Sequence, residues 1–243
     1  MSLYVVGIGP GDRPYMTGQS LAALEKSGVV VGYEPYIRLI EDLVAGKRII
    51  ASGMRKEKER AAAAVEEARN GHTVALVSSG DAGVYGMAGL ALEIAENDPD
   101  LEIEIIPGVT AALSASAMLG APLMNDFAAI SLSDLLTPWP TIEKRLMAAA
   151  QGDFAIALYN PASHKRRDVL PKAREILLQY RAPETPCGLV RNAGREGCAK
   201  EICTLAELTE KPVDMFTTVI VGNSQTKVIN GRLVTARGYD DGK

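Results

Sequence analysis

Short apolar strand patterns alternate with amphipathic helix patterns along the first half of the chain, and this alternation constrains the fold more than any other feature. The strand patterns are mostly continuous runs of Val, Ile and other apolar residues, which is typical of parallel strands buried on both faces. Helices between such strands predict a mostly parallel sheet that is covered on both sides. We expect strands at residues 3–8, 29–32, 48–51, 73–77 and 102–106, and helices at 17–27, 36–45, 56–70, 85–96 and 110–119.

The pattern changes near residues 120–124, and strands become more frequent in the rest of the chain. An Asn230-Gly231 pair between two short runs predicts a hairpin turn. We therefore predict two α/β domains, residues 1–120 and 121–243, with a mostly parallel sheet in the first and a mixed sheet in the second. The second domain is expected to have strands at 128–132, 154–159, 187–191, 201–204 and 216–221, and helices at 141–151 and 166–180.

The first predicted strand ends in the sequence Gly-Ile-Gly-Pro-Gly-Asp, at Gly7–Asp12. Glycines have no Cβ atom, so a ligand could approach the main-chain amides of this turn closely. The spacing differs from that of a dinucleotide-binding loop, because the third glycine comes too early and Asp12 would repel a phosphate. A Walker loop is excluded because no Gly-Lys-Ser/Thr follows. The turn therefore either borders a ligand other than a phosphate or is a tight turn without a ligand.

Other predicted strands also end in Gly, Pro, Asn, Asp and small residues. These turns lie at 79–83, 107–111, 160–161 and 192–194. Ligands of open parallel sheets bind outside the carboxyl ends of the strands. The coincidence of so many unusual turns at strand ends predicts one cleft to which both domains contribute.

Composition excludes several classes of function. The chain has 26 Lys and Arg residues against 30 Asp and Glu, so it has no basic excess for nucleic-acid binding. No apolar run is long enough to span a membrane and no signal peptide is evident, so we expect a cytoplasmic protein. The three cysteines and two histidines do not have the spacing of a metal site, which predicts free thiols and no protein-bound metal.

The chemistry available in the predicted cleft is limited. The sequence has no Gly-x-Ser-x-Gly motif and no basic cradle for phosphate. Main-chain amides, small hydroxyls and a few carboxylates suit a zwitterionic sulfonium donor, whose positive charge Asp81 could offset. Group transfer between two bound partners depends mostly on positioning, which can supply roughly 7–11 kcal/mol of barrier reduction.

Three motifs in the chain are similar to those of the S-adenosylmethionine-dependent tetrapyrrole methylases. They are Gly-x-Gly-Pro-Gly-Asp at 7–12, Ser-Gly-Asp-x-Gly-Val-Tyr-Gly at 79–86 and Pro-Gly-Val-Thr-Ala at 107–111. Further segments, at 130–139, 158–163 and 217–226, resemble the branch that methylates C17 of precorrin-3B, or of cobalt-factor III, with ring contraction in cobalamin (vitamin B12) synthesis. The chain departs from the commoner family pattern at Ala82, where a proline is usual.

The resemblance implies two α/β domains with S-adenosylmethionine bound between them, S-adenosylhomocysteine as its product, a tetrapyrrole substrate and a homodimer. By position, the residues that it implies for the cofactor are Pro10, Ser79, Gly80, Asp81, Val84, Thr110, Ala111, Tyr159, Asn160, Asn192, Ala193 and Thr218. The residues expected to meet the substrate are Gly9, Gly11, Asp12, Arg55, Lys165, Arg166 and Arg191. The basic residues at 55–58 and 165–167 could instead be solvated helix starts.

Ring contraction requires proton movement, so a general acid or base is expected. The candidates are Asp12, Ser131, Ser133, Asp134 and His164. A turn or cap role is an equal alternative for Asp134, and capping or packing is the favoured alternative for His164. Two other functions stay open: a sibling methylase that acts at C11, at C20 or at C2 and C7 of uroporphyrinogen, and a non-catalytic nucleotide-binding regulatory protein with the same fold.

Overall fold

A computed structural model describes residues 2–163 and 166–239 of the chain. The chain divides into two compact units, one ending at Ala111 and the other beginning at Ala112. Each unit has its own sheet and its own hydrophobic core. The α/β class predicted from the alternating pattern is confirmed.

The first unit is built on a five-stranded sheet in which every pair of neighbouring strands is parallel. Because all strands run the same way, the turns after them gather at one edge of the sheet, which we call the first carboxyl edge. The strands in spatial order are β3 (Arg48–Ser52), β2 (Val29–Tyr33), β4 (Thr73–Ser78), β1 (Ser2–Gly7) and β5 (Glu102–Ile106).

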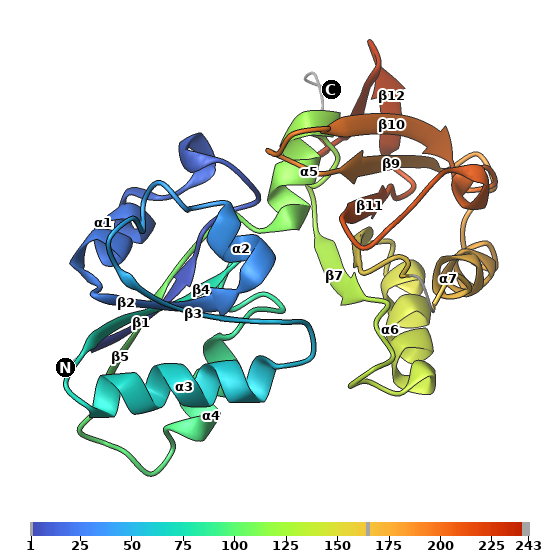
Figure 1. The fold of residues 1–243 in the computed structure, drawn as a ribbon. Coiled ribbons are helices and arrows are strands. Elements are labelled where there is room, and N and C mark those ends of the chain that lie inside the picture. The colour runs from blue at the N-terminus through green and yellow to red at the C-terminus, as the bar shows by residue number, and fades with distance from the viewer. Residues whose placement is uncertain (1, 164–165, 240–243) are drawn as a thin grey trace. The chain divides into compact units, whose positions relative to one another are not determined.

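Helices cover both faces of this sheet (Figure 1). On one face, α1 (Gly18–Lys26) and the segment around α2 (Glu34–Arg38) pack against the sheet. On the other face lie α3 (Glu57–Arg69) and α4 (Ala88–Ile94). Helix α3 buries the alanines and valine that recur every three or four residues, and Gly71 beyond its end has a φ of +93°, as a helix stop requires.

Two helices of the first unit are shorter than the sequence pattern predicts. Helix α2 starts early, because Pro35 suits a first turn, and it ends at Arg38, well before the predicted residue 45. Helix α4 begins only at Ala88, because Tyr85 has a φ of +55° and cannot continue a helix. A short 3₁₀ helix, Arg13–Tyr15, separates β1 from α1, and the Thr17 side chain caps α1 by accepting a hydrogen bond from Ser20 N.

The second unit has a mixed five-stranded sheet, as predicted. Strands β7, β8 and β9 run in one direction, and β10 and β11 run in the other. The strands in spatial order are β10 (Ala199–Thr204), β9 (Pro186–Arg191), β11 (Thr217–Val221), β8 (Ala155–Tyr159) and β7 (Phe127–Ser131). The ends of β7, β8 and β9 and the start of β11 therefore share one edge, which we call the second carboxyl edge.

This second sheet is also covered on both faces. Helices α6 (Trp139–Gln151) and α7 (Val169–Leu177) pack on one face, and α5 (Ala111–Leu119) packs on the other. The side chains of β8 alternate accordingly, with Ile156 and Leu158 toward α6 and α7 and Ala157 toward α5. A short 3₁₀ helix, Leu208–Glu210, completes the helices of this unit that the structure describes.

A small third sheet also belongs to the second unit. Strands β12 (Thr226–Ile229) and β13 (Arg232–Thr235) form a hairpin, and β6 (Gly120–Ala121) pairs with β13. The predicted Asn-Gly turn is confirmed, since Asn230 and Gly231 both have positive φ. Pairing with β13 explains why residue 120 is a glycine, because a Cβ on Gly120 would lie 2.5 Å from the carbonyl oxygen of Leu233.

None of the described helices is long and apolar enough to cross a membrane. All three cysteines are free. Burial raises the pKa of the Cys203 thiol to about 11 and also raises that of Cys187, which lies opposite it on the neighbouring strand. These two thiols are therefore protonated near neutral pH.

Glycines at the first carboxyl edge let the turns after β1, β4 and β5 pack backbone against backbone. A Cβ on Gly108 would lie 2.1 Å from the carbonyl oxygen of Gly80 and 2.6 Å from that of Gly7. A Cβ on Gly7 would meet the amide nitrogen of Gly108 at 2.7 Å. Backbone atoms cannot move aside as a flexible side chain can, so any larger residue must separate the three turns.

We predict that Gly108→Ala lowers the free energy of unfolding by about 2 kcal/mol, because the added methyl overpacks this contact. Urea denaturation measures the change. Gly89→Ala is the matched control, since Gly89 lies in α4 with nothing within 4 Å of its Cβ position, and alanine there is expected to stabilise by up to about 1 kcal/mol. Equal effects of the two substitutions would contradict the packing argument.

Candidate functional site

The turns at the first carboxyl edge are joined by main-chain hydrogen bonds. Gly9 and Gly80 pair like two short strands, with Gly9 N donating to Gly80 O at 3.0 Å and Gly80 N donating to Gly9 O at 2.7 Å. The main-chain amide of Gly9, which we expected a ligand to approach, is thus already bound to the carbonyl oxygen of Gly80. The missing side chains instead permit close approach of the turns.

Asp81 ties two of these turns together through its carboxylate. Its Oδ1 accepts a hydrogen bond from Gly83 N at 2.8 Å, within the same turn. Its Oδ2 accepts one from Gly108 N at 2.9 Å, in the turn after β5. Each oxygen therefore has a separate structural partner, and Asp81 sets the relative position of the two turns.

Most other residues of the first unit that are predicted to bind the cofactor lie on the turns after β1, β4 and β5. Pro10 is buried, whereas Ser79, Val84 and Thr110 are half-buried. Helix α5 begins at Ala111, directly after the turn that follows β5. The structure thus gathers at one edge the residues that are far apart in the sequence.

Asp12 differs from its neighbours in the turn after β1. Gly11 is buried, but Asp12 is exposed. Its main-chain oxygen accepts a hydrogen bond from Tyr15 N at 2.9 Å, while its carboxylate has no hydrogen bond or ion pair to any described residue. Asp12 is therefore an unengaged carboxylate at the first carboxyl edge.

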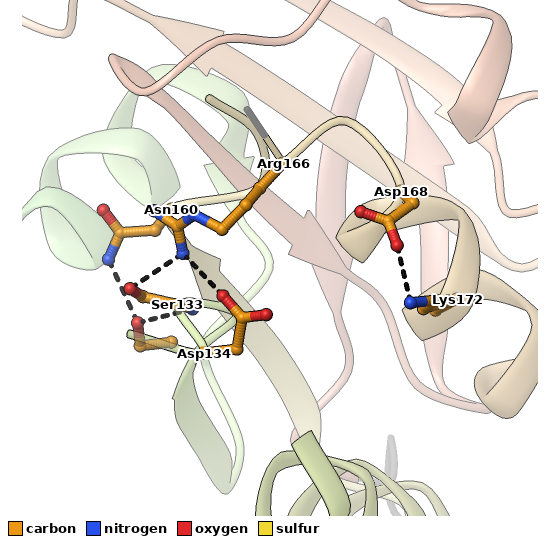
Figure 2. A network of polar contacts seen from close by, with 7 residues as sticks. Ser133, Asp134, Asn160, Arg166, Asp168 and Lys172 are labelled. Atoms are coloured by element: carbon orange, nitrogen blue, oxygen red, sulfur yellow. Dashed lines mark hydrogen bonds and ion pairs between the residues drawn. The ribbon is translucent and has the colours of Figure 1, made fainter. Parts of the chain in front are cut away.

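A polar network forms at the second carboxyl edge, where β7 and β8 end (Figure 2). Asn160 Nδ2 donates to Ser131 Oγ at 3.0 Å, and Ser133 N donates to the same oxygen at 3.2 Å. Arg166 Nη1 then donates to Ser133 Oγ at 2.9 Å and to Asp134 Oδ1 at 3.3 Å. Three of the predicted proton-transfer candidates, Ser131, Ser133 and Asp134, are thus parts of one network that joins the turns after β7 and β8.

The remaining residues predicted for the cofactor in the second unit end β8, follow β9 or lie near the start of β11. Tyr159 is half-buried, and its hydroxyl accepts a hydrogen bond from Ala112 N at 2.9 Å, near the start of α5. Asn192 N donates to Phe216 O at 3.1 Å, which joins the end of β9 to the start of β11. Ala193 is half-buried beside it, and Thr218 is buried. Asn160 and Asn192 have φ values of +54° and +50°, which Asn tolerates better than most residues.

The basic residues predicted to meet the substrate have different surroundings. Arg55, after β3, is exposed and has no hydrogen bond or ion pair to any described residue. Arg166 is held by Ser133 and Asp134, and Arg191 Nε lies 2.7 Å from Asp214 Oδ2. Lys165 and His164 lie outside the described residues. Among the described members of this set, Arg55 is therefore the cation without a partner.

The segment at 217–226, which resembles the C17 branch, runs from one edge of the five-stranded sheet of the second unit to the opposite edge. Thr217 and Thr218 begin β11 at the second carboxyl edge. Asn223 and Thr226 lie beyond the other end of this strand, where Asn223 N donates to Thr226 Oγ1 at 2.8 Å and Thr226 shares a hydrogen bond of 2.8 Å with Thr235. The second half of the segment is a buried polar cluster that holds the hairpin.

Sequence reasoning missed two buried polar residues of the first unit. Ser20 in α1 donates through Oγ to Gly7 O at 2.8 Å, so it fixes the end of β1. Arg60 in α3 is buried at the ends of β2 and β3. Helical spacing could have found Arg60, because it lies four residues before Ala64 on the apolar face of α3.

No group of three or more His, Cys, Asp or Glu side chains in the described part of the chain is placed to hold a metal ion. The geometry instead offers two strand edges lined by turns, each with a few fixed polar groups. Such edges can position small molecules through main-chain and side-chain hydrogen bonds.

We predict that Asp81→Asn lowers the free energy of unfolding by about 2 kcal/mol, since the amide nitrogen cannot accept the bond that one carboxylate oxygen accepts. Thermal or urea denaturation provides the value. The control is Asp98→Asn, which weakens the partly exposed Asp98–Arg69 ion pair and is expected to cost less than about 1 kcal/mol. An Asp81 variant as stable as this control would refute the role of Asp81 in joining the turns.

Asn160 offers a test that separates backbone conformation from side-chain bonding. Asn160→Gly loses the bond to Ser131 but keeps the positive φ, so we predict a loss of about 1 kcal/mol. Asn160→Ala also has to adopt the left-handed conformation, which adds about 1 kcal/mol or more. Denaturation of both variants measures the difference, and Ser131→Ala serves as the control for the lost hydrogen bond. Equal losses for the glycine and alanine variants would contradict the strain argument.

Comparison with known proteins connects this arrangement to a family. The sequence profile of the Tetrapyrrole (Corrin/Porphyrin) Methylases matches residues 2–209. The chain is 49% identical over 238 residues to a probable cobalt-factor III C(17)-methyltransferase of Salmonella typhimurium. This alignment covers 98% of this chain and 99% of that protein. A protein of the same name from Methanocaldococcus jannaschii is 44% identical over 247 residues, which is 98% of each chain. The crystal structure of the methyltransferase CobJ superposes with a TM-score of 0.91 at 39% identity, over 97% of this chain and 99% of that one. The chain therefore belongs to the tetrapyrrole (corrin/porphyrin) methylases.

Proposed function

We propose that the protein transfers a methyl group from S-adenosylmethionine to C17 of cobalt-factor III, with ring contraction, in cobalamin synthesis. The observation that carries this proposal is near-complete alignment with two relatives named as cobalt-factor III C(17)-methyltransferases, at 49% and 44% identity. The segments at 130–139 and 158–163 support the same branch through their sequence resemblance, and Ser131, Ser133 and Asn160 from them take part in the polar network at the second carboxyl edge. Precorrin-3B, the cobalt-free counterpart, is the other substrate to be tested.

The residues present suit a zwitterionic sulfonium compound. The first carboxyl edge has an acidic residue, Asp81, among half-buried small and apolar side chains such as Val84. At the second carboxyl edge, the resemblance assigns Tyr159 and Ala193 to the same cofactor, and both side chains are half-buried. When bound, S-adenosylmethionine supplies the methyl group and leaves as S-adenosylhomocysteine. The residues that we assign to its binding are those that the resemblance implies. They are Pro10, Ser79, Gly80, Asp81, Val84, Thr110, Ala111, Tyr159, Asn160, Asn192, Ala193 and Thr218.

For the tetrapyrrole, the described groups without partners are the most suitable. Arg55 can meet a carboxylate arm of the substrate without first losing another ion pair. Arg166 would have to give up or share Asp134, and Arg191 would have to do the same with Asp214. We therefore assign Arg55 as the first substrate contact among these cations.

Proton transfer during ring contraction is assigned by the same reasoning. Asp12 has a carboxylate with no described partner, whereas Asp134 is paired with Arg166 and Ser131 Oγ accepts hydrogen bonds from Asn160 and Ser133. A group that is already free can exchange a proton with a substrate without breaking a network. We propose Asp12 as the acid or base, and Asp134 as a group that holds Arg166 in place. Homodimer formation and a cytoplasmic location stay predictions from the sequence.

The test is to incubate the protein with labelled S-adenosylmethionine and cobalt-factor III without oxygen, and in parallel with precorrin-3B. We expect the cobalt substrate to gain one methyl group, with an absorbance change that reports ring contraction. Methylation without contraction, or at another carbon, would instead identify a sibling methylase. Binding of S-adenosylmethionine without transfer to either substrate would favour a regulatory protein.

Asp12→Asn tests the assignment of the proton-transfer group. We predict that turnover falls by about 10²-fold or more, because general acid–base catalysis typically contributes that much. Binding of S-adenosylmethionine, measured by calorimetry, should be unchanged. Asp100→Asn is the control, since Asp100 is also exposed but lies just before β5, at the opposite edge of the same sheet. Full turnover by a folded Asp12→Asn enzyme would exclude Asp12 from proton transfer.

A further inference from the structure

We propose that Arg60 is a positioning residue for substrate binding, because it holds the turn after β3 in the conformation that presents Arg55 at the first carboxyl edge. The inference rests on the proposed function, since it takes the bound molecule to be a tetrapyrrole with carboxylate arms. It assigns a role to a residue that neither the motifs nor the resemblance implicate.

Arg60 is almost completely buried, with 5% of its surface exposed. Its Nε donates to Ser52 Oγ at 2.9 Å and its Nη2 donates to Gly53 O at 2.9 Å. Its guanidinium carbon lies 5.5 Å from the centre of the Tyr33 ring, and Nη1 lies 3.9 Å from Met87 Sδ. The guanidinium thus contacts the ends of β2 and β3 and the residue just before α4.

No carboxylate in the described part of the chain forms an ion pair with Arg60. Burial of an unpaired charge is unfavourable, and an apolar residue of similar size would avoid that penalty. What the guanidinium provides here is a planar set of donors, two of which reach Ser52 and Gly53 in fixed directions. A cation-π contact with Tyr33 partly offsets the missing counter-ion.

The Arg60 side chain holds the start of the turn between β3 and α3, because it binds Gly53 O. The end of the turn is fixed by the first turn of α3, where Arg60 N donates to Lys56 O at 2.9 Å, as any helical residue there would. Between these two points lies Arg55, with a φ of +65°. A left-handed conformation is rare for arginine, so the surroundings must maintain it.

The two basic residues of the turn between β3 and α3, Arg55 and Lys56, differ in whether they have a counter-ion. Lys56 pairs with Glu59 at 2.6 Å, so its ammonium already has a counter-ion. Arg55 is exposed and has no described partner. Fixing the backbone on both sides of Arg55 reduces the conformational freedom that it would lose on binding a carboxylate, which favours affinity without a direct contact from Arg60.

The experiment is a double-mutant cycle with Arg55→Gln, Arg60→Gln and the double variant, using equilibrium binding of cobalt-factor III and steady-state kinetics. If Arg60 acts through Arg55, each single substitution raises the KM for the tetrapyrrole about tenfold, the effect of one charge-assisted hydrogen bond. The double variant should then be no worse than Arg55→Gln alone. Both kcat and the affinity for S-adenosylmethionine should change less than about twofold.

Two further variants keep the test decisive. Ser52→Ala removes the partner of Arg60 Nε but leaves the charge, so it should raise the KM in the same direction even if Arg60→Gln does not fold. Arg69→Gln is the matched control, because Arg69 lies at the other end of α3 and pairs with Asp98 and Glu66. We expect the control to leave the KM for the tetrapyrrole unchanged.

Additive effects of Arg55→Gln and Arg60→Gln would overturn the inference, as would an unchanged KM in Arg60→Gln and Ser52→Ala. Normal turnover by the unmodified protein in that case would leave the proposed function intact. If the unmodified protein neither binds nor methylates a tetrapyrrole, the proposed function fails and this inference fails with it.

Discussion

Backbone contact between turns at the first carboxyl edge is the constraint on which the rest of the first unit depends. Gly7 and Gly108 leave no room for a Cβ atom, so the ends of β1 and β5 can approach each other and the turn after β4 until main-chain atoms touch. Only then can Gly9 and Gly80 exchange hydrogen bonds and Asp81 bind Gly108 N. The glycine turn after β1 is therefore a packing element first. Any ligand meets the surface that this packing creates.

Charged groups at the two edges divide into those that shape the turns and those that are free. Asp81 and Arg60 are committed to main-chain partners, and Asp134 and Arg166 are committed to each other. Arg181 is held in the same way at the opposite edge of the second sheet, where it donates hydrogen bonds to the carbonyl oxygens of Phe154 and Gly222. Burial lowers the pKa of the Arg181 guanidinium. A charge fixed in this way costs free energy to redirect, because its present partners would be left unsatisfied. Groups without partners can thus meet a charged arm of a substrate without giving up an existing bond.

The order of strands and helices could be predicted because burial imposes periods of two and of about 3.6 residues on the sequence. The failures have local causes. Pro35 starts α2 early, and the positive φ of Tyr85 delays α4, neither of which hydrophobic periodicity reports. The burial of Arg60 was not predicted because it ends a run of charged residues at 55–60. Only its position four residues before Ala64, on the same face of α3, indicates that it is buried. The free state of Arg55 could not be predicted at all, because it depends on which side chains of distant segments come within reach.

Backbone strain supports the same division between structural and free groups. Among the described residues, six that are not glycine have a positive φ, and four of them follow strands at the two carboxyl edges: Arg55, Tyr85, Asn160 and Asn192. Asparagine adopts this conformation readily, so Asn160 and Asn192 need little support from their surroundings. Arginine and tyrosine do not, and both Arg55 and Tyr85 are exposed, so burial of their own side chains does not hold them there. For Arg55, the described support is the Arg60 side chain, which binds Ser52 Oγ and Gly53 O before it, together with the first turn of α3 after it. A strained, exposed cation maintained by a buried one is better explained by ligand binding than by stability, because an unstrained turn would serve stability alone.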